Sequence, residues 1–148
     1  DLYQTIEAAI KEAMLAKDRM RLQALRGIKK EFIEARTAPG SNGELSDGEA
    51  LKILVKMAKQ RRESAEIYTQ QNRPELAEAE LAQAAVIEEY MPKQLSPEEL
   101  DAALREIIAR VGATSPKEMG KVMGVASKEL AGKAEGRAIS AAVKALLS

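Results

Sequence analysis

The sequence contains no cysteine, no histidine and no tryptophan, and only four aromatic residues among 148. Without cysteine, the chain has no disulfide, no thiolate nucleophile and no cysteine-ligated zinc or iron–sulfur site. Without histidine, it lacks the one side chain whose unperturbed pKa lies near neutrality, which excludes Ser-His-Asp and Cys-His catalysis. The sequence therefore predicts no catalytic residue, no metal site and no cofactor.

Long apolar runs and an excess of either charge are also absent. No stretch approaches the roughly 20 apolar residues that a membrane-spanning helix needs, and no secretory signal is visible. We therefore expect a cytoplasmic protein with no membrane partner. The chain has 23 basic and 23 acidic residues, and 45% of its residues are hydrophobic. This composition is typical of a folded protein rather than a disordered one.

Apolar residues recur every three or four positions along the whole chain, which is the period of an amphipathic helix. No stretch alternates with the period of a strand, so the sequence predicts an all-α fold. The first helix has one apolar face made by Leu2, Ile6, Ile10, Ala13 and Met14, and the second has Leu22, Leu25, Phe32 and Ile33. Further helices are expected at about 19–36, 47–71, 74–90, 97–111 and 116–131. A final helix carries Ile139, Ala142, Val143 and Leu146.

Several local motifs mark where these helices begin and end. Ser46 with Glu49 and Ser96 with Glu99 have the spacing of capping boxes, in which serine and glutamate each satisfy a backbone N–H. Residues 115–118 repeat the second pattern. Gly112 is a candidate left-handed C-cap. The segment from 91 to 100 is the best boundary, so we predict a four-helix N-terminal domain (1–91), a linker (92–96) and a small three-helix C-terminal domain (97–148).

Charge is uneven within the neutral total. Residues 17–36 hold seven basic and three acidic residues, residues 52–62 hold five basic and no acidic ones, and residues 74–91 hold five glutamates and no basic residue. We expect the acidic helix to pair with the basic faces of the second and third helices. A second, weaker cationic surface is conceivable at Arg26, Lys29, Lys30, Arg61 and Arg62.

The segment MGKVMGVASKELAGKAEG (119–136) departs from ordinary helix composition. On a helical wheel, Lys117, Lys121 and Lys128 share one side, and Gly120 and Gly124 lie among them. Glycine inside an exposed helix costs roughly 1 kcal/mol relative to alanine, so a close approach of another backbone would explain it. Three explanations stay open: packing of a neighbouring helix of this chain, contact with a sugar-phosphate backbone, or contact with a partner protein.

Several separated strings resemble the GatB/YqeY family, and above all its free-standing YqeY-like members. They are RLQALRGIKKEFIEA, KQRRESAEIY, NRPELAEAE, EEYMPKQLSPEEL and MGKVMGVASKELAGKAEG. The last string is also similar to the C-terminal tail domain of the B subunit of the tRNA-dependent glutamine amidotransferase. Family members usually have aspartate where this chain has Glu135.

The resemblance implies a non-catalytic, tRNA-associated accessory module in amidotransferase-dependent or synthetase-dependent aminoacyl-tRNA formation. Its expected partner is the tRNA phosphate backbone. An alternative is a protein-interaction module that docks on an amidotransferase or an aminoacyl-tRNA synthetase. Carbon–nitrogen ligase activity with glutamine as amide donor is a weaker hypothesis, because the chain has neither cysteine nor histidine. The expected nucleic-acid-binding residues are Lys117, Lys121, Gly124, Lys128, Lys133, Gly136, Arg137 and Lys144.

Overall fold

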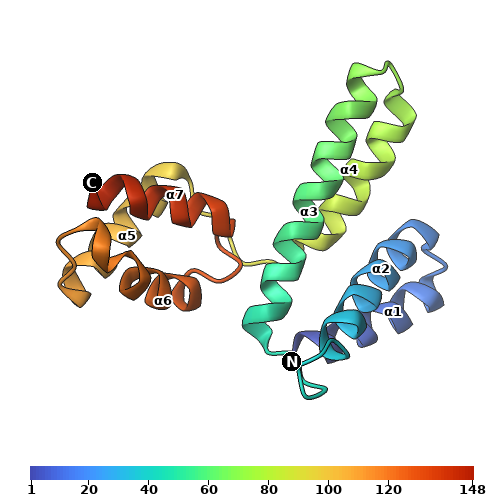
Figure 1. The fold of residues 1–148 in the computed structure, drawn as a ribbon. Coiled ribbons are helices and arrows are strands. Elements are labelled where there is room, and N and C mark those ends of the chain that lie inside the picture. Colours follow the sequence, from blue (N-terminus) through green and yellow to red (C-terminus); the bar gives the residue numbers. More distant parts are fainter. The chain divides into compact units, whose positions relative to one another are not determined.

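The computed structural model describes residues 1–148 and is entirely helical, which confirms the all-α prediction (Figure 1). None of the helices combines the length and apolar character needed to cross a bilayer. The chain divides into two compact units, residues 1–91 and residues 92–148. Its elements are α1 (Leu2–Ala16), α2 (Arg19–Arg36), α3 (Asp47–Gln70), α4 (Pro74–Glu88), α5 (Pro97–Val111), the 3-10 turn η1 (Pro116–Glu118), α6 (Met119–Glu129) and α7 (Gly136–Leu147).

The first unit consists of two helical hairpins, α1–α2 and α3–α4, packed on one core. The fully buried side chains of this core come from α1, α2, α3 and α4, and the largest is Phe32. Burying each such aliphatic or aromatic side chain contributes about 1.5–3 kcal/mol. The members with the least exposure are Ile6, Leu25, Ile28, Phe32, Leu54 and Ile87.

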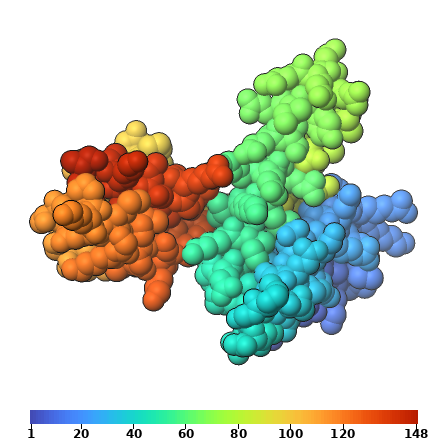
Figure 2. All heavy atoms as spheres, in the orientation of Figure 1, coloured from blue at the N-terminus to red at the C-terminus, as the bar shows by residue number.

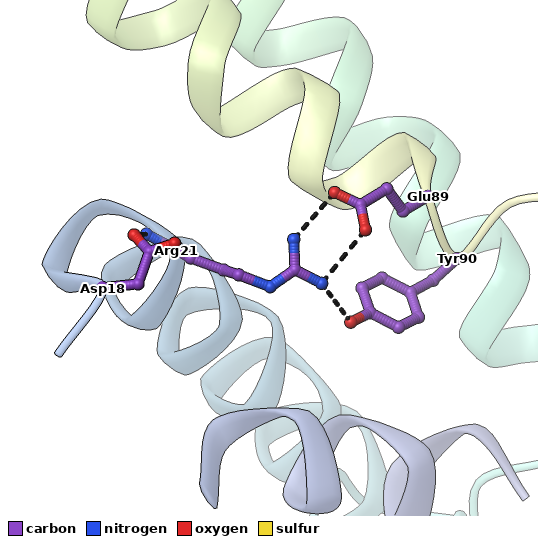
Figure 3. Close-up of polar contacts among 4 residues, drawn as sticks. All are labelled: Asp18, Arg21, Glu89 and Tyr90. Atoms are coloured by element: carbon purple, nitrogen blue, oxygen red, sulfur yellow. Dashed lines mark hydrogen bonds and ion pairs between the residues drawn. The ribbon is translucent and has the colours of Figure 1, made fainter. Parts of the chain in front are cut away.

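A polar cluster joins the start of α2 to the end of α4 (Figure 3). The Arg21 guanidinium donates to both carboxylate oxygens of Glu89, at 2.7 and 3.0 Å, and to the Tyr90 hydroxyl at 2.9 Å. The hydrogen bond to Glu89 raises the pKa of Arg21. Asp18 caps α2 by accepting from the backbone N–H of Arg21 at 3.1 Å. The cluster therefore fixes the first turn of α2 against the end of α4.

The expected pairing of the acidic helix with basic faces is confirmed. Besides Arg21 on α2, two arginines of α3 pair with α4: Arg61 lies 3.1 Å from Glu80, and Arg62 binds Glu88. Lys29 pairs with Glu7 at 3.3 Å. Three of the five residues suggested for a second cationic surface, Lys29, Arg61 and Arg62, therefore have carboxylate partners within the unit.

Two residues assigned to apolar faces lie at the surface instead. Met14 is 53% exposed and Ile33 is 39% exposed. On α1 and α2 the buried stripe is narrower than the apolar pattern, because residues such as Ala9, Ala13 and Ala24 occupy the contact between the helices. Leu76 and Leu81 of α4 are also 41% exposed.

The second unit packs α5, α6 and α7 around its own core. Leu104, Val122, Ala126 and Val143 are fully buried there. At the start of α5, Ser96 and Glu99 form the complete capping box, and Gly112 ends the helix in the left-handed region with φ 73°, as predicted. At Ser46 only the serine half of the predicted box forms, because the Glu49 carboxylate accepts from the Ser46 hydroxyl.

The helix expected at 116–131 differs in both its start and its end. Residues 116–118 form a 3-10 turn, and α6 runs only from Met119 to Glu129. Ser115 makes no capping hydrogen bond. The Glu118 carboxylate accepts from the backbone N–H of Thr114 instead of Ser115. The second copy of the Ser-Pro-Lys/Glu-Glu pattern is thus not a capping box, and Lys117 lies outside the α-helical wheel on which it was placed.

Candidate nucleic-acid interface

The predicted site residues all lie at the surface of the second unit. Lys117 is in η1, and Lys133 is in the loop between α6 and α7. The structure places three of the predicted residues on α6 and three on α7, and all eight are exposed. Those on α6 are Lys121, Gly124 and Lys128, and those on α7 are Gly136, Arg137 and Lys144.

The three α6 residues form one face, which we call the lysine–glycine face. Their spacing of three, four and seven residues puts them on one side of the helix, and Gly120 is exposed beside them. At 1.5 Å of rise per residue, Lys121 and Lys128 are about 10.5 Å apart along the axis. The opposite side of α6 is buried through Val122 and Ala126. The core contact of α6 therefore directs this face to solvent.

The two glycines of α6 border open space. A Cβ added at Gly120 or Gly124 would meet no heavy atom within 4 Å. The explanation that a neighbouring helix of this chain packs closely on the two glycines is therefore wrong. No side chain protrudes at the two glycines, and no other group of this chain packs on them. Contact with an RNA backbone and contact with a partner protein are therefore the two explanations that stay open for these glycines.

The acidic residues around this face are occupied by other groups. Arg110 of α5 binds the Glu129 carboxylate at 2.7 and 2.8 Å, and this hydrogen bond lowers the pKa of Glu129. Glu118 accepts from a backbone N–H. None of the six predicted cations forms a salt bridge. The second unit thus presents positive charge that its own carboxylates do not neutralise.

The loop that carries Lys133 is fixed by the segment expected to be a linker. The Leu95 N–H donates to the Lys133 carbonyl at 2.9 Å, and the Gln94 amide donates to the carbonyls of Gly132 and Pro92. Gly132 has φ 76°, a left-handed conformation that glycine adopts without strain. These contacts hold the backbone of the loop just before α7.

The first turn of α7 has no side-chain cap. Glu135 is at the N-cap position, and its side chain makes no capping hydrogen bond. Gly136 is the first helical residue, and a Cβ there would also meet nothing within 4 Å. The N-terminal backbone N–H groups of a helix carry partial positive charge and attract anions. This end of α7 therefore adds to the positive potential of Lys133 and Arg137.

Two contacts that shape the site were not foreseen. The Arg110–Glu129 pair joins residues 19 positions apart, and the Leu95–Lys133 bond joins residues 38 positions apart. Neither has a local pattern, because helical periodicity and capping motifs report only on residues within about one turn of each other. Only the packing of α6 on α5, and of the 94–95 segment on the loop, brings these groups together.

Comparison with known proteins agrees with the strings quoted above. The family model of the YqeY-like proteins matches residues 3–147. Two similar proteins are called "Altered inheritance of mitochondria protein 41, mitochondrial". The one from Clavispora lusitaniae is 31% identical over 76% of this chain and 65% of its own length. The one from Meyerozyma guilliermondii is 32% identical over 82% of this chain and 64% of its own length.

This chain therefore spans slightly less than two thirds of each of these relatives. The family model, in contrast, covers almost all of the chain and both of its compact units. The chain belongs to the YqeY-like protein family.

Proposed function

We propose that the chain is a non-catalytic accessory module that binds the phosphate backbone of tRNA through the second unit. The observation that carries this proposal is the lysine–glycine face of α6. Lys121 and Lys128 are exposed and unpaired, and Gly124 between them borders open space. Phosphate contacts of this kind fix position and add affinity, and they carry little sequence information.

The remaining predicted residues extend this surface. Lys117 and Lys133 flank α6 in the chain, and Gly136, Arg137 and Lys144 belong to α7. No aromatic residue occurs in residues 92–148, so stacking on bases does not contribute there. We infer modest, salt-sensitive affinity. Such affinity suits a module that raises the local concentration of tRNA near an amidotransferase or a synthetase.

The proposal includes a division of labour between two separate domains, a four-helix domain in residues 1–91 and a three-helix domain in residues 92–148. Non-catalytic action agrees with a chain that has neither cysteine nor histidine. The similar yeast proteins are named as mitochondrial. For this chain we propose a cytoplasmic location.

The test is binding of total tRNA to the full chain by fluorescence anisotropy at about 50–200 mM salt. The variant is Lys121→Glu with Lys128→Glu. Its matched control is Lys52→Glu with Lys56→Glu, which makes the same charge change on exposed lysines of α3 that form no salt bridge. We expect the slope of log K against log salt to lose roughly 1.4–1.8 in the α6 variant, because each phosphate contact contributes about 0.7–0.9.

Three outcomes are informative. Binding that falls with salt and is lost only in the α6 variant supports phosphate contact at this face. Equal loss in the control variant contradicts the site, because it reports only net charge. No binding at the lowest salt rejects autonomous RNA binding.

A second candidate function is docking on a partner protein through the same face. The open space over Gly120 and Gly124 favours it, because a partner helix can approach a glycine surface closely. Salt distinguishes the two. Backbone packing on the glycines depends weakly on ionic strength, whereas phosphate contact depends on it steeply.

A further inference from the structure

The α3–α4 hairpin extends past the core that it shares with α1 and α2 (Figure 1). The core cluster includes Ala58 and Val86 but no residue of 59–85. In that outer part, Ala65, Ala77 and Ala84 are buried between the two helices. In Figure 2 the far end of this hairpin, in green, stands clear of the blue α1–α2 pair. The outer part of α3 therefore has a side that no third helix covers.

A groove lies along that side of α3, next to α2. Its volume is about 470 Å³, and two apolar side chains, Met57 and Ile67, lie ten residues apart in its lining. Ile67 is 52% exposed. Ten residues of helix span about 15 Å. The remaining lining residues are Glu31, Gln60, Arg61, Glu63 and Ser64.

The unpaired charge in the lining of the groove is negative. Glu31 of α2 is exposed and forms no ion pair. The positive charge of Arg61 is neutralised by Glu80. Glu63 lies 3.8 Å from Lys59, so Glu31 is the unpaired charge of the lining. An occupant with both apolar and basic groups matches this surface.

The turn between α1 and α2 carries that chemistry. Leu15 is 86% exposed, which is the largest exposure of any large apolar residue, and Met14 and Met20 are 53% and 41% exposed. Lys17 and Arg19, in the same turn, are exposed and form no salt bridge. The nearest carboxylate, Asp18, caps α2. Apolar methionine and leucine with unpaired cations therefore form one tip.

The tip and the groove are parts of one patch. Met20, Gly27 and Glu31 are spaced seven and four residues apart, so they share a face of α2. A Cβ at Gly27 would lie 4.0 Å from Met57 Cε, which places that face of α2 against the groove side of α3. The patch thus has a basic, apolar end at the tip and an acidic, apolar part in the groove.

We propose that this patch joins two copies of the chain, with the α1–α2 tip of each copy in the groove of the other. A two-fold axis brings unlike ends of such a patch together twice, which closes the assembly as a dimer. A second copy is the occupant because the same chain carries both complementary parts: exposed Leu15 with the unpaired Lys17 at the tip, and Ile67 with the unpaired Glu31 in the groove. The basic helices of the second unit offer no exposed apolar side chain of that size. The dimer is independent of tRNA binding, which uses the second unit.

The first test measures the mass of the full chain by sedimentation as concentration rises. We expect a shift from the chain mass of 16.1 kDa toward twice that value. Leu15→Glu and Ile67→Lys should each abolish the shift with unchanged helicity, and both sites are exposed, so neither change disturbs the core. A chain that stays monomeric throughout, or variants that dimerise normally, would overturn the proposal.

A charge exchange tests the pairing of tip with groove. Lys17→Glu and Glu31→Lys should each weaken the dimer by about tenfold or more, and the chain with both changes should recover most of the loss. Glu75→Lys is the matched control, since Glu75 is exposed on α4 outside the groove. Additive weakening in the double variant would show that the two residues do not face each other across the interface.

The absence of cysteine permits a direct proximity test. Two proteins, one with Leu15→Cys and the other with Gln60→Cys, are mixed and treated with a short bis-maleimide. We expect a cross-linked heterodimer, because Gln60 lines the groove. The control mixture replaces Gln60→Cys by Lys52→Cys, on the same helix outside the groove. Equal cross-linking in both mixtures would reject the arrangement.

Discussion

The two glycines of α6 give a prediction in which stability and binding change in opposite directions. Changing both Gly120 and Gly124 to alanine should stabilise the second unit. Each exposed helical glycine costs roughly 0.8–1 kcal/mol relative to alanine, and neither new Cβ meets an atom within 4 Å. Gly124 is in the helix interior and Gly120 is in the first turn of α6, so the expected gain is about 1–2 kcal/mol. For a unit this small, each kcal/mol raises the unfolding midpoint by roughly 4–8 °C.

The chain allows the two units to be followed separately. All three tyrosines lie in residues 1–91, and there is no tryptophan. Circular dichroism at the helical band reports on both units, whereas tyrosine fluorescence reports on the first unit alone. The alanine variant should raise the midpoint of the transition seen only by circular dichroism and leave the fluorescence transition in place.

The matched control is Gly112→Ala. A Cβ at Gly112 also meets open space, but its φ of 73° is left-handed, where alanine is strained by roughly 1–2 kcal/mol. This variant should therefore destabilise the second unit. If alanine at 120 and 124 failed to stabilise α6, the assignment of both glycines to exposed helical positions would be refuted.

The same variant tests why glycine is present. If a phosphate backbone approaches α6 between Lys121 and Lys128, the two added methyl groups should weaken tRNA binding although both lysines remain. Unchanged affinity in a more stable protein would contradict close approach and would leave the glycines without a role in RNA binding.

Three further predictions concern stability. Gln83 is 8% exposed and its Oε1 has no hydrogen-bond partner. Gln83→Met should therefore stabilise the first unit by about 1 kcal/mol, measured by urea unfolding followed by tyrosine fluorescence. A loss of stability would show that the oxygen has a partner. Lys17 has φ 58°, so Lys17→Gly should raise the free energy of unfolding of the first unit by about 1 kcal/mol and weaken the proposed dimer. Stabilisation without weaker dimerisation would show that Lys17 is not in the interface. Arg110 lowers the pKa of Glu129, so its stabilising effect is present at neutral pH and is lost as the pH falls below the ordinary glutamate value of 4.5. Arg110→Ala should reduce the acid sensitivity of the second unit between neutrality and pH 3, measured by circular dichroism, and an unchanged profile would contradict the pairing.

Local signals predicted the fold where a single turn of chain decides the structure. Ser96 and Glu99 cap α5 reciprocally and Gly112 ends it, because these residues act on backbone groups three or four positions away. The same rule failed at Ser115. There the 3-10 turn moved the Glu118 carboxylate to the Thr114 N–H, and the sequence has no feature that distinguishes this outcome from a second capping box.

The apolar pattern was less reliable at the surface than in the core. Leu25 and Phe32 are buried as the pattern predicts, yet Met14 is 53% exposed and Ile33 is 39% exposed. A wheel identifies the apolar side of a helix, but the width of the buried stripe depends on how many neighbours the helix has. The outer half of the α3–α4 hairpin has no third helix beside it. The same apolar spacing that builds a core elsewhere therefore leaves Ile67 at the surface.

The net charge of zero conceals a difference between the two units. Residues 1–91 contain 14 basic and 16 acidic residues, whereas residues 92–148 contain nine and seven. The difference is small, so net charge alone does not separate the proposed phosphate-binding unit from its neighbour. Pairing does. In the first unit Arg21 of α2 and both arginines of α3 pair with carboxylates of α4 and its end. In the second unit Arg110 binds Glu129, and the α6 lysines have no carboxylate partner. Local potential depends on such uncompensated charges. Arg110 lies on α5, outside the proposed site. Arg110→Ala should nevertheless weaken tRNA binding, because it releases the Glu129 carboxylate beside Lys128.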